Sequence, residues 1–148
     1  RWCLGVQARV KFHGCLAPDA VRRLMADAAL LAMPSRRMPD GDRDGIANVL
    51  IEAMALGVPV VTTMAGAAAE VVGDRVTGRL VPPDDVPALA AALEELLGDA
   101  EQRARLAQAA RATVETYFDS RLTGAALSSL LASHARVRPI SSLLQSSP

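Results

Sequence analysis

Residues Asp44 to Gly57 read DGIANVLIEAMALG, and the rest of the chain can be interpreted around this segment. A charged loop leads into an apolar segment of helical length, and Gly57 ends that segment in the usual C-terminal position. Glu52 stands inside the apolar part, eight residues after Asp44. A carboxylate in such a helix needs a partner, because removing an unpaired charge from water is costly. We therefore expect Glu52 to meet either a basic side chain of the protein or a ligand.

Short apolar segments alternate with amphipathic ones on both sides of this stretch. The patterns predict strands at 9–13, 30–33, 58–63 and 79–81, and helices at 18–29, 48–56, 101–118 and 121–134. They also predict a turn into a short helix at 65–72, and a further helix that begins after Asp84 or Asp85. Strands that alternate with helices favour an α/β fold with a parallel sheet and right-handed crossovers. The chain is predicted to form one domain over residues 1–135, and the tail at 136–148 is predicted to fray.

Ligands in such a sheet bind outside the carboxyl ends of the strands. The functional edge is therefore expected at the loops that follow four positions: His13, Pro34, Thr63 and Val81. Beyond that edge, Asp84 or Asp85 can cap the next helix. The leucines of the C-terminal helices are predicted to face the core, namely Leu89, Leu93, Leu96, Leu97, Leu127, Leu130 and Leu131.

Composition excludes several classes of function. Sixteen basic residues balance sixteen acidic ones, so no overall positive field indicates a nucleic-acid partner. No apolar segment reaches the roughly 20 residues of a membrane-spanning helix. The two cysteines, Cys3 and Cys15, are too few for a disulfide framework and lack metal-ligand spacing, and the two histidines lie far apart. We expect a cytoplasmic protein without a metal site.

The opening stretch carries groups that suit a nucleoside diphosphate sugar. The backbone N–H groups where the loop enters the helix favour a phosphate, and Gly45 lets the backbone approach it closely. The Glu52 carboxylate can accept two hydrogen bonds from the vicinal hydroxyls of a ribose, and Asp44 can accept hydrogen bonds from a second sugar. Two alternatives stay open: Asp44 can be a helix cap or a solvated acid, and Glu52 can pair with Arg36 or Arg37.

The region from Val10 to Phe118 also resembles the C-terminal, nucleotide-sugar-binding domain of retaining glycosyltransferases with the GT-B fold, the GT4 or "glycosyl transferases group 1" family. The matching segments are VKFHG at 10–14, ADAALLAMPS at 26–35, DGIANVLIEAMALGVPVVTT at 44–63, GAAAEVV at 66–72 and TGRLVPPDD at 77–85. The family motif of two acidic residues eight positions apart falls on Asp44 and Glu52, with Asp in place of the usual first Glu. The resemblance implies a Rossmann-like parallel sheet with flanking helices, the partial C-terminal half of a GT-B protein.

The resemblance implies a role for each matching residue. Glu52 would bind the ribose, while Asp44, Gly45, Ile46 and Ala47 would contact the transferred sugar. Backbone groups of Ala47 and Asn48 would bind the diphosphate. The turn formed by Gly14, Cys15 and Leu16 would line the base pocket. No cofactor or metal is implied, because protein cations stabilise the leaving diphosphate.

The first residue is Arg1 rather than methionine, and we expect a fragment that lacks the N-terminal acceptor domain and the start of its own domain. The family's diphosphate-binding Arg and Lys would lie upstream. The parent protein is then a hexosyl or related transferase of polysaccharide or lipopolysaccharide synthesis, acting on a glycan or lipid-linked acceptor through the missing domain, with peripheral inner-membrane attachment as an option. The 148-residue chain itself is expected to be inactive.

Three alternative hypotheses stay open. The chain can be a weak nucleotide-binding module without chemistry, which titration with nucleotides would distinguish. It can be a sugar-nucleotide epimerase of the same architecture, although the histidine and glutamate pattern of such enzymes is not found around residues 44–63. It can also be a structural remnant that dimerises through a bare helical face.

Overall fold

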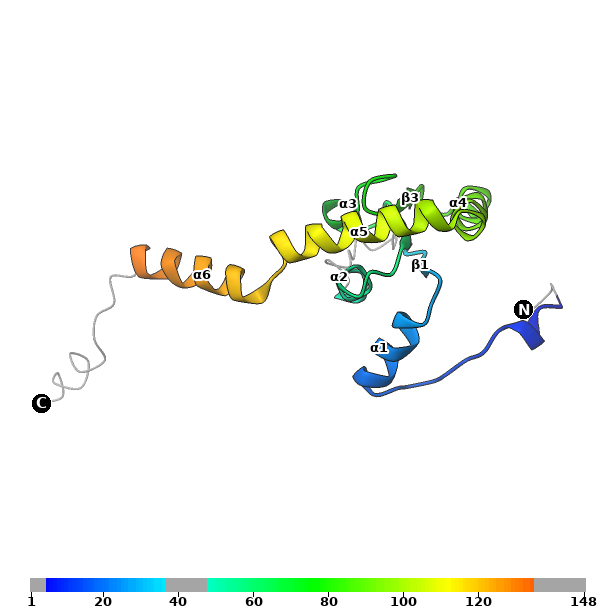
Figure 1. Cartoon of the computed structure of the whole chain (residues 1–148), viewed down its shortest axis with the longest axis horizontal. Coiled ribbons are helices and arrows are strands. Elements are labelled where there is room, and N and C mark those ends of the chain that lie inside the picture. Colours follow the sequence, from blue (N-terminus) through cyan, green and yellow to red (C-terminus); the bar gives the residue numbers. More distant parts are fainter. Residues whose placement is uncertain (1–4, 37–47, 135–148) are drawn as a thin grey trace, which may run out of the picture.

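The computed structural model describes residues 5–36 and 48–134. The elements in chain order are η1 (Gln7–Arg9), α1 (Pro18–Ala26), β1 (Leu31–Met33), α2 (Asn48–Ala55), β2 (Val60–Thr63), α3 (Ala68–Val71), β3 (Arg79–Val81), α4 (Val86–Gly98), α5 (Ala100–Tyr117) and α6 (Ser120–His134). This order confirms the predicted α/β alternation from β1 onward (Figure 1).

The three described strands form a parallel sheet in the order β1-β2-β3. Val61 is the register partner of Ala32 on one side and of Arg79 on the other. All four residues of β2 are buried, which fits a central strand covered on both faces, and its β-branched sequence VVTT suits that environment. The predicted parallel sheet with flanking helices is confirmed.

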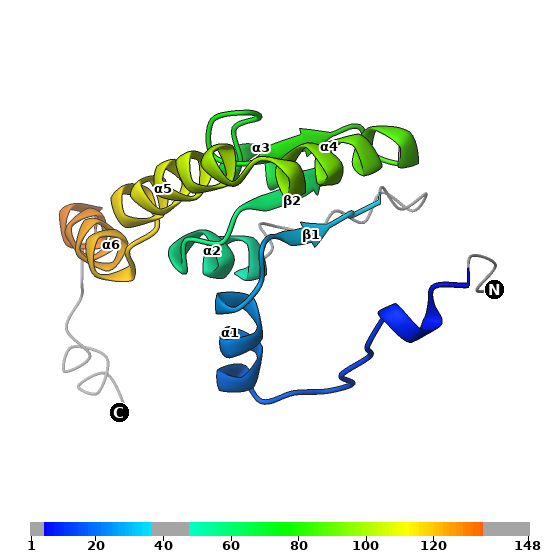
Figure 2. The same cartoon turned by 45° about the vertical axis from the view of Figure 1, so that its right-hand side comes forward.

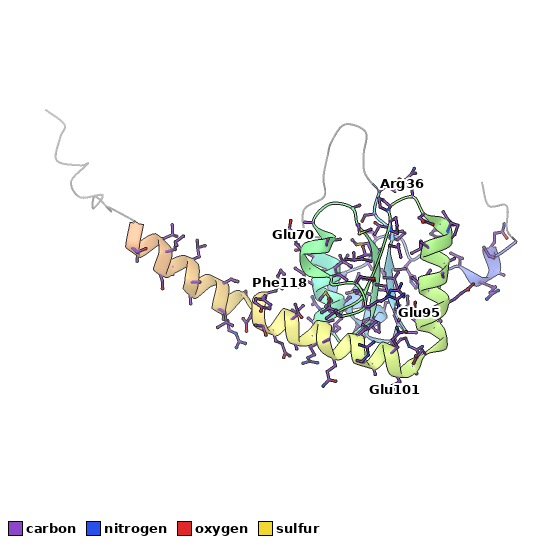
Figure 3. All side chains as sticks on the ribbon, turned by 90° about the horizontal axis from the view of Figure 1, so that it is seen from above. Arg36, Glu70, Glu95, Glu101 and Phe118 are labelled. Atoms are coloured by element: carbon purple, nitrogen blue, oxygen red, sulfur yellow. The ribbon has the colours of Figure 1, made fainter. Side chains whose placement is uncertain are left out.

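Helices cover both faces of the sheet, and the alternation along β2 assigns each residue to one face. Val60 packs in a core with Leu50 and Met54 of α2, while Val61 packs in a second core with Leu96 of α4. Figure 3 shows α2 and α4 on opposite sides of the strands. Because successive side chains of a strand point to opposite faces, Thr63 lies on the α4 face with Val61.

Helix α5 closes the edge of the sheet at the amino ends of the strands. Its Leu106 belongs to the core beneath α4, and its Ala110 and Val114 belong to the core beneath α2. Figure 3 shows this helix crossing the domain on the side opposite Arg36. With α5 at one edge, the carboxyl edge is the side where loops can form a site.

The strand predicted at 9–13 is wrong. Residues 7–9 form η1, and the following segment runs exposed and away from the sheet to α1 (Figure 2). The side chain of Phe12 is 74% exposed. A strand requires a neighbouring strand for its backbone hydrogen bonds, and no described strand lies beside this segment.

The inward direction predicted for several leucines is also wrong. Leu97 of α4 is 57% exposed, and three leucines of α6 are 56–58% exposed, namely Leu127, Leu130 and Leu131. Figure 1 shows α6 extending away from the domain, which agrees with the exposure of these leucines. Leu96 is fully buried as predicted, and Leu89 and Leu93 pack against the core beside it.

The predicted helix at 18–29 is shorter and ends at Ala26. The predicted tail lies outside the described residues.

Candidate functional site at the carboxyl edge of the sheet

The segments that leave the three strands meet at one pocket on the α4 face. Its volume is about 570 Å³, within the range of small-molecule sites. Its lining residues are Pro34, Ser35, Arg36, Thr63, Pro82, Asp84, Asp85, Val86 and Leu89. This confirms that the ends of the strands at Pro34, Thr63 and Val81 share one edge. The segment after His13 does not join them, because no strand precedes it among the described residues.

Threonine hydroxyls hold the start of the loop after β1. Thr63 donates a hydrogen bond from Oγ1 to the carbonyl oxygen of Ser35 at 2.5 Å, and Thr62 donates to that of Met33 at 2.9 Å. Both threonines are buried, so these hydrogen bonds are shielded from water. The exit of β1, from which the chain continues toward Asp44, is therefore fixed to the end of β2.

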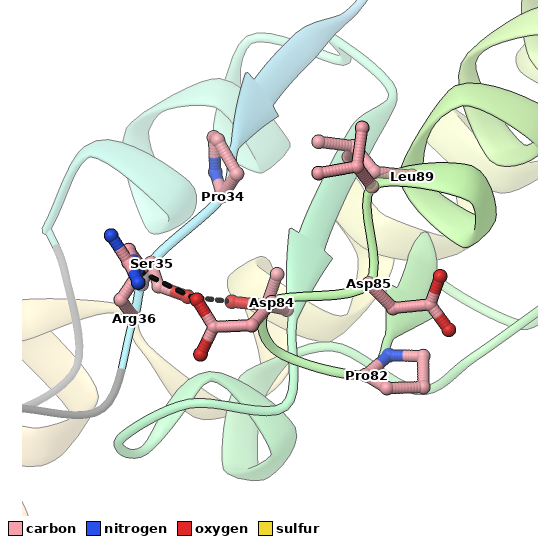
Figure 4. Close-up of a pocket in the computed structure, with 9 residues that line it drawn as sticks. Pro34, Ser35, Arg36, Pro82, Asp84, Asp85 and Leu89 are labelled. Atoms are coloured by element: carbon pink, nitrogen blue, oxygen red, sulfur yellow. Dashed lines mark hydrogen bonds and ion pairs between the residues drawn. The ribbon is translucent and has the colours of Figure 1, made fainter.

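An ion pair joins the loops after β1 and β3. Arg36 donates from Nε to Oδ1 of Asp84 at 2.6 Å (Figure 4). The two side chains are 76% and 54% exposed, so the pair is worth little to stability. Asp84 has a φ of +62°, a left-handed conformation that aspartate tolerates better than most residues. Asp85 caps α4 by accepting a hydrogen bond from the backbone N–H of Ala88 at 2.9 Å, one of the two caps predicted.

Glu52, the candidate ribose-binding residue, lies on α2. Asn48 is the first residue of this helix, and Glu52 follows one turn later. Both are exposed, and the structure shows no ion pair between Glu52 and another described residue. The alternative partner Arg36 pairs with Asp84 instead. Because Asn48 and Glu52 are four residues apart, they lie on the same side of α2, in its N-terminal half.

The other residues predicted to contact the donor fall into two groups, at 44–47 and at 14–16. Asp44, Gly45, Ile46 and Ala47 fall outside the described residues, as does Arg37. The segment at 14–16 lies between η1 and α1, where Gly14 has a φ of +65°, Cys15 is exposed and Leu16 is half-buried. That segment does not line the pocket described above. Its assignment to the base stays a prediction.

A second charged cluster holds the opposite end of the sheet together. Arg79, nearly buried at the start of β3, donates to Asp74 at 3.1 Å and also to Glu95 of α4. Glu95 accepts a further hydrogen bond from Nε2 of Gln102 at 2.7 Å, and Asp74 accepts one from the backbone N–H of Leu80 at 2.9 Å. The cluster ties β3, α4 and α5 to one another.

Hydrogen bonding sets the charge state of this cluster. The hydrogen bond from Gln102, aided by Arg79, holds the pKa of the Glu95 carboxyl below its ordinary value. Partial burial acts to raise the pKa of Asp74, but the Leu80 N–H and the Arg79 guanidinium outweigh it and lower that pKa. Burial likewise acts against the charged form of Arg79, but its two carboxylate partners raise its pKa. The cluster therefore stays ionised at neutral pH.

Neither a metal site nor a membrane helix is found in the described part of the chain. Within residues 5–36 and 48–134, no three His, Cys, Asp or Glu side chains gather closely enough to hold a metal ion. No helix in the same ranges combines the length and apolar character needed to cross a bilayer.

The sequence patterns missed the side chains that build the pocket. The sequence presents Arg36 only as a possible partner of Glu52, but it pairs with Asp84, a residue 48 positions away. Thr63 reads only as the end of a strand. The position of both residues at the carboxyl edge was a usable signal, whereas their partners depend on how β1, β2 and β3 align.

A family model described as "Glycosyl transferases group 1" matches residues 2–113. Among curated relatives, the amylovoran biosynthesis glycosyltransferase AmsK of Erwinia amylovora is 35% identical over 82% of this chain and 30% of its own length. The GDP-mannose-dependent monoacylated alpha-(1-6)-phosphatidylinositol monomannoside mannosyltransferase of Corynebacterium glutamicum is 37% identical over 92% of this chain and 36% of its own. The chain thus spans about a third of the length of these relatives.

Solved structures show the same architecture. HepE from Anabaena, in complex with UDP, superposes with a TM-score of 0.79 at 32% identity, over 87% of this chain and 34% of its own. The same protein in complex with UDP-glucose gives a TM-score of 0.78. The three-stranded sheet and its helices therefore correspond to part of a GT-B protein.

Proposed function

The chain belongs to the glycosyl transferases group 1 family, and we propose that it forms the donor-binding part of a retaining, GT4-type glycosyltransferase that uses a nucleoside diphosphate sugar. In the complete protein, the bond between the anomeric carbon and the diphosphate breaks. A new bond forms between the anomeric carbon and the oxygen of an acceptor hydroxyl, with the same anomeric configuration, and the nucleoside diphosphate and the hydroxyl proton are released. Relatives of this chain include glycosyltransferases of amylovoran and colanic acid biosynthesis. Their names support the proposal that the acceptor is a growing glycan or a lipid-linked glycan. Such a reaction would take place in the cytoplasm, where nucleotide sugars are made.

The observation that carries this proposal is the position of Glu52. Its carboxylate is exposed on α2, one turn from the helix start, and no described basic side chain pairs with it. A carboxylate there can accept hydrogen bonds from both ribose hydroxyls, and such charged hydrogen bonds are the strong ones. The nearby helix start, with Ala47 and Asn48, would bind the diphosphate. Asp44, Gly45, Ile46 and Ala47 would contact the sugar, and Gly14, Cys15 and Leu16 would contact the base.

Nucleotide titration of the 148-residue chain tests the ribose assignment. UDP, GDP and ADP are each titrated calorimetrically into the native chain and into Glu52→Ala. We expect at least one nucleotide to bind, and the substitution to weaken its affinity about tenfold through the loss of charged hydrogen bonds. Glu101→Ala, an exposed carboxylate at the opposite edge, is the matched control and should bind as the native chain does. Unchanged affinity in Glu52→Ala contradicts the assignment.

Transfer needs more than this donor site. We expect the chain to bind nucleotide without releasing or transferring sugar. The family's diphosphate-binding Arg and Lys would stabilise the leaving group, and none of the described arginines of this chain corresponds to them. A radiolabelled donor assay measures both hydrolysis and transfer. Appreciable turnover by the chain alone would show that the catalytic groups are already present.

A further inference from the structure

The backbone pairing of β1 with β2 stops before the connection that leads to α2. The two strands pair in parallel register, and their last pair joins Met33 to Thr62. Ser35 lies two residues beyond that pair. The side chain of Thr63 reaches it, because the Thr63 hydroxyl donates a hydrogen bond to the Ser35 carbonyl oxygen at 2.5 Å. A side-chain hydroxyl therefore continues the attachment of β1 to β2 where the strand pairing ends.

Thr63 is itself held firmly in the sheet. It is the last residue of the central strand, it is only 3% exposed, and its register partner on β3 is Val81. The next residue, Met64, donates its backbone N–H to the Val81 carbonyl oxygen at 2.9 Å. Water competes little for a hydroxyl in such a buried position. The Ser35 carbonyl is therefore attached to a group that moves only with the sheet.

The ion pair between Arg36 and Asp84 is a second attachment at the same place. It joins the residue after Ser35 to the loop after β3 (Figure 4). Both side chains are largely exposed, so water and dissolved ions compete with this pair. Of the two attachments, the buried hydrogen bond from Thr63 therefore fixes the exit of β1 more firmly.

Helix α2 is held by different interactions. Its residues Leu50, Ala53 and Met54 are fully buried, and they pack in a core with Val60 of β2. Core packing therefore fixes Glu52, whereas the connection before the helix is attached at its start through Thr63. The two parts of the proposed donor site, the ribose contact on α2 and the sugar contact at 44–47, thus depend on separate interactions.

From this arrangement we propose that Thr63 is a positioning residue for the sugar-binding part of the donor site. The inference rests on the proposed function and adds to it a residue that touches no substrate. By holding Ser35, the Thr63 hydroxyl fixes the point from which the connection to α2 starts. Fewer conformations then have to be lost when that connection contacts a sugar, and such preorganisation strengthens binding.

Calorimetric titration tests whether the two parts of the site are separable. UDP, UDP-glucose, GDP and GDP-mannose are titrated into the native 148-residue chain, Thr63→Val and Thr63→Ser. Thr63→Val should weaken the binding of a nucleotide sugar about fivefold, the equivalent of one neutral hydrogen bond, and that of its nucleotide less than about twofold. Thr63→Ser keeps the hydroxyl and should restore most of the loss.

Thr77→Val is the matched control. Thr77 is 7% exposed, and its Oγ1 accepts a hydrogen bond from the backbone N–H of Gly73 at 2.8 Å. It lies in the turn before β3, at the amino edge of the sheet. Both valine variants should lose stability in urea, but Thr77→Val should bind nucleotides and nucleotide sugars as the native chain does. Equal weakening of sugar binding in the two variants would reveal a general effect on folding and overturn the inference.

The Ser35 amide gives a second measurement, which needs no ligand. Its N–H donates to the Met33 carbonyl oxygen at 3.0 Å, so its exchange rate reports on the exit of β1. Hydrogen exchange followed by NMR should show this amide exchanging about fivefold faster in Thr63→Val, because the Ser35 carbonyl has lost its donor. The rate should be close to native in Thr63→Ser and in Thr77→Val.

The outcomes distinguish this inference from the donor proposal. Glu52-dependent nucleotide binding, with nucleotide-sugar affinity unchanged in Thr63→Val, overturns the positioning role alone. An equal loss of affinity for nucleotide and nucleotide sugar in that variant overturns it as well. A chain that binds neither kind of ligand overturns the donor proposal. The Ser35 exchange rate then decides whether Thr63 holds the exit of β1, and a native rate in Thr63→Val shows that it does not.

Discussion

The two edges of the sheet carry the same kinds of side chain in opposite environments. At the amino edge, Arg79 is nearly buried between Asp74 and Glu95, and the cluster joins three elements. At the carboxyl edge, Arg36 meets Asp84 with both side chains largely in solvent. Removing one partner of a buried ion pair is costly because it leaves an unpaired charge away from water, whereas a pair surrounded by water contributes little and can exchange partners. The amino edge therefore holds the fold, and the carboxyl edge is available to ligands.

Replacement of each arginine by methionine tests this comparison most strongly. Arg79→Met should lower the free energy of unfolding by about 2–3 kcal/mol, because Asp74 and Glu95 lose the buried one of the two cations that they share. The other, Arg75, is largely exposed and replaces little of that interaction. Arg36→Met is the matched control and should change it by about 0.5 kcal/mol or less. Urea unfolding followed by circular dichroism measures both. Equal effects of the two substitutions would remove the distinction between the edges.

A glycine next to the amino-edge cluster gives the next largest effect. A Cβ at Gly78 would lie 2.7 Å from Cγ2 of Val60 and 2.9 Å from its carbonyl oxygen. Gly78→Ala must displace β2 backbone, so we expect a loss of about 2 kcal/mol in unfolding free energy. Gly98 has open space around its Cβ position, and Gly98→Ala should be neutral or slightly stabilising. A neutral Gly78→Ala would show that the turn before β3 can move.

At the carboxyl edge, the hydroxyl of Thr63 gives a smaller effect. Thr63→Val keeps the shape of the side chain but leaves the Ser35 carbonyl without this donor, at a cost of about 1 kcal/mol. Thr116 also donates to a backbone carbonyl, that of Ala112, but it is exposed on α5. Thr116→Val should therefore have a smaller effect in the same urea series.

The smallest effect is the pH dependence of stability. The pKa values of Asp74 and Glu95 are lowered in the folded state. Their contribution is therefore complete above the ordinary carboxyl pKa values and is lost as the pH falls below about 4 and through the lowered values. Stability should fall more steeply on acidification in the native chain than in Arg79→Met, because the variant lacks the arginine that helps to lower these two pKa values. Urea midpoints measured across the acid range compare the two slopes, and parallel slopes would contradict the assignment.

Elements with strong local signals were predicted from sequence. The β-branched segment at 60–63 forms the central strand, and Asp85 caps α4 as one of two predicted caps. These features depend on residues adjacent in the chain, such as the capped N–H of Ala88. The gathering of strand ends at one edge was also predicted, because parallel strands connected by helices place their carboxyl ends together.

Features that depend on distant partners were not predicted. The VKFH segment has the alternation of a strand, but no described strand lies beside it for hydrogen bonding. The leucines of α6 have helical spacing, but the helix extends beyond the domain and leaves them exposed. The Arg36–Asp84 pair joins residues 48 positions apart, and no local pattern specifies such a contact.

Periodicity and motif spacing are local properties of the chain, and they were enough to predict the α/β class, the parallel sheet and Glu52 as a candidate ribose-binding residue. The packing of strands and helices was needed to tell which charges hold the fold and which face solvent. Arg79 and Arg36 are both arginines near acidic residues, and no spacing rule separates them. Their roles differ because the fold buries Arg79 beside α4 at the amino edge, whereas Arg36 lies exposed at the pocket of the carboxyl edge.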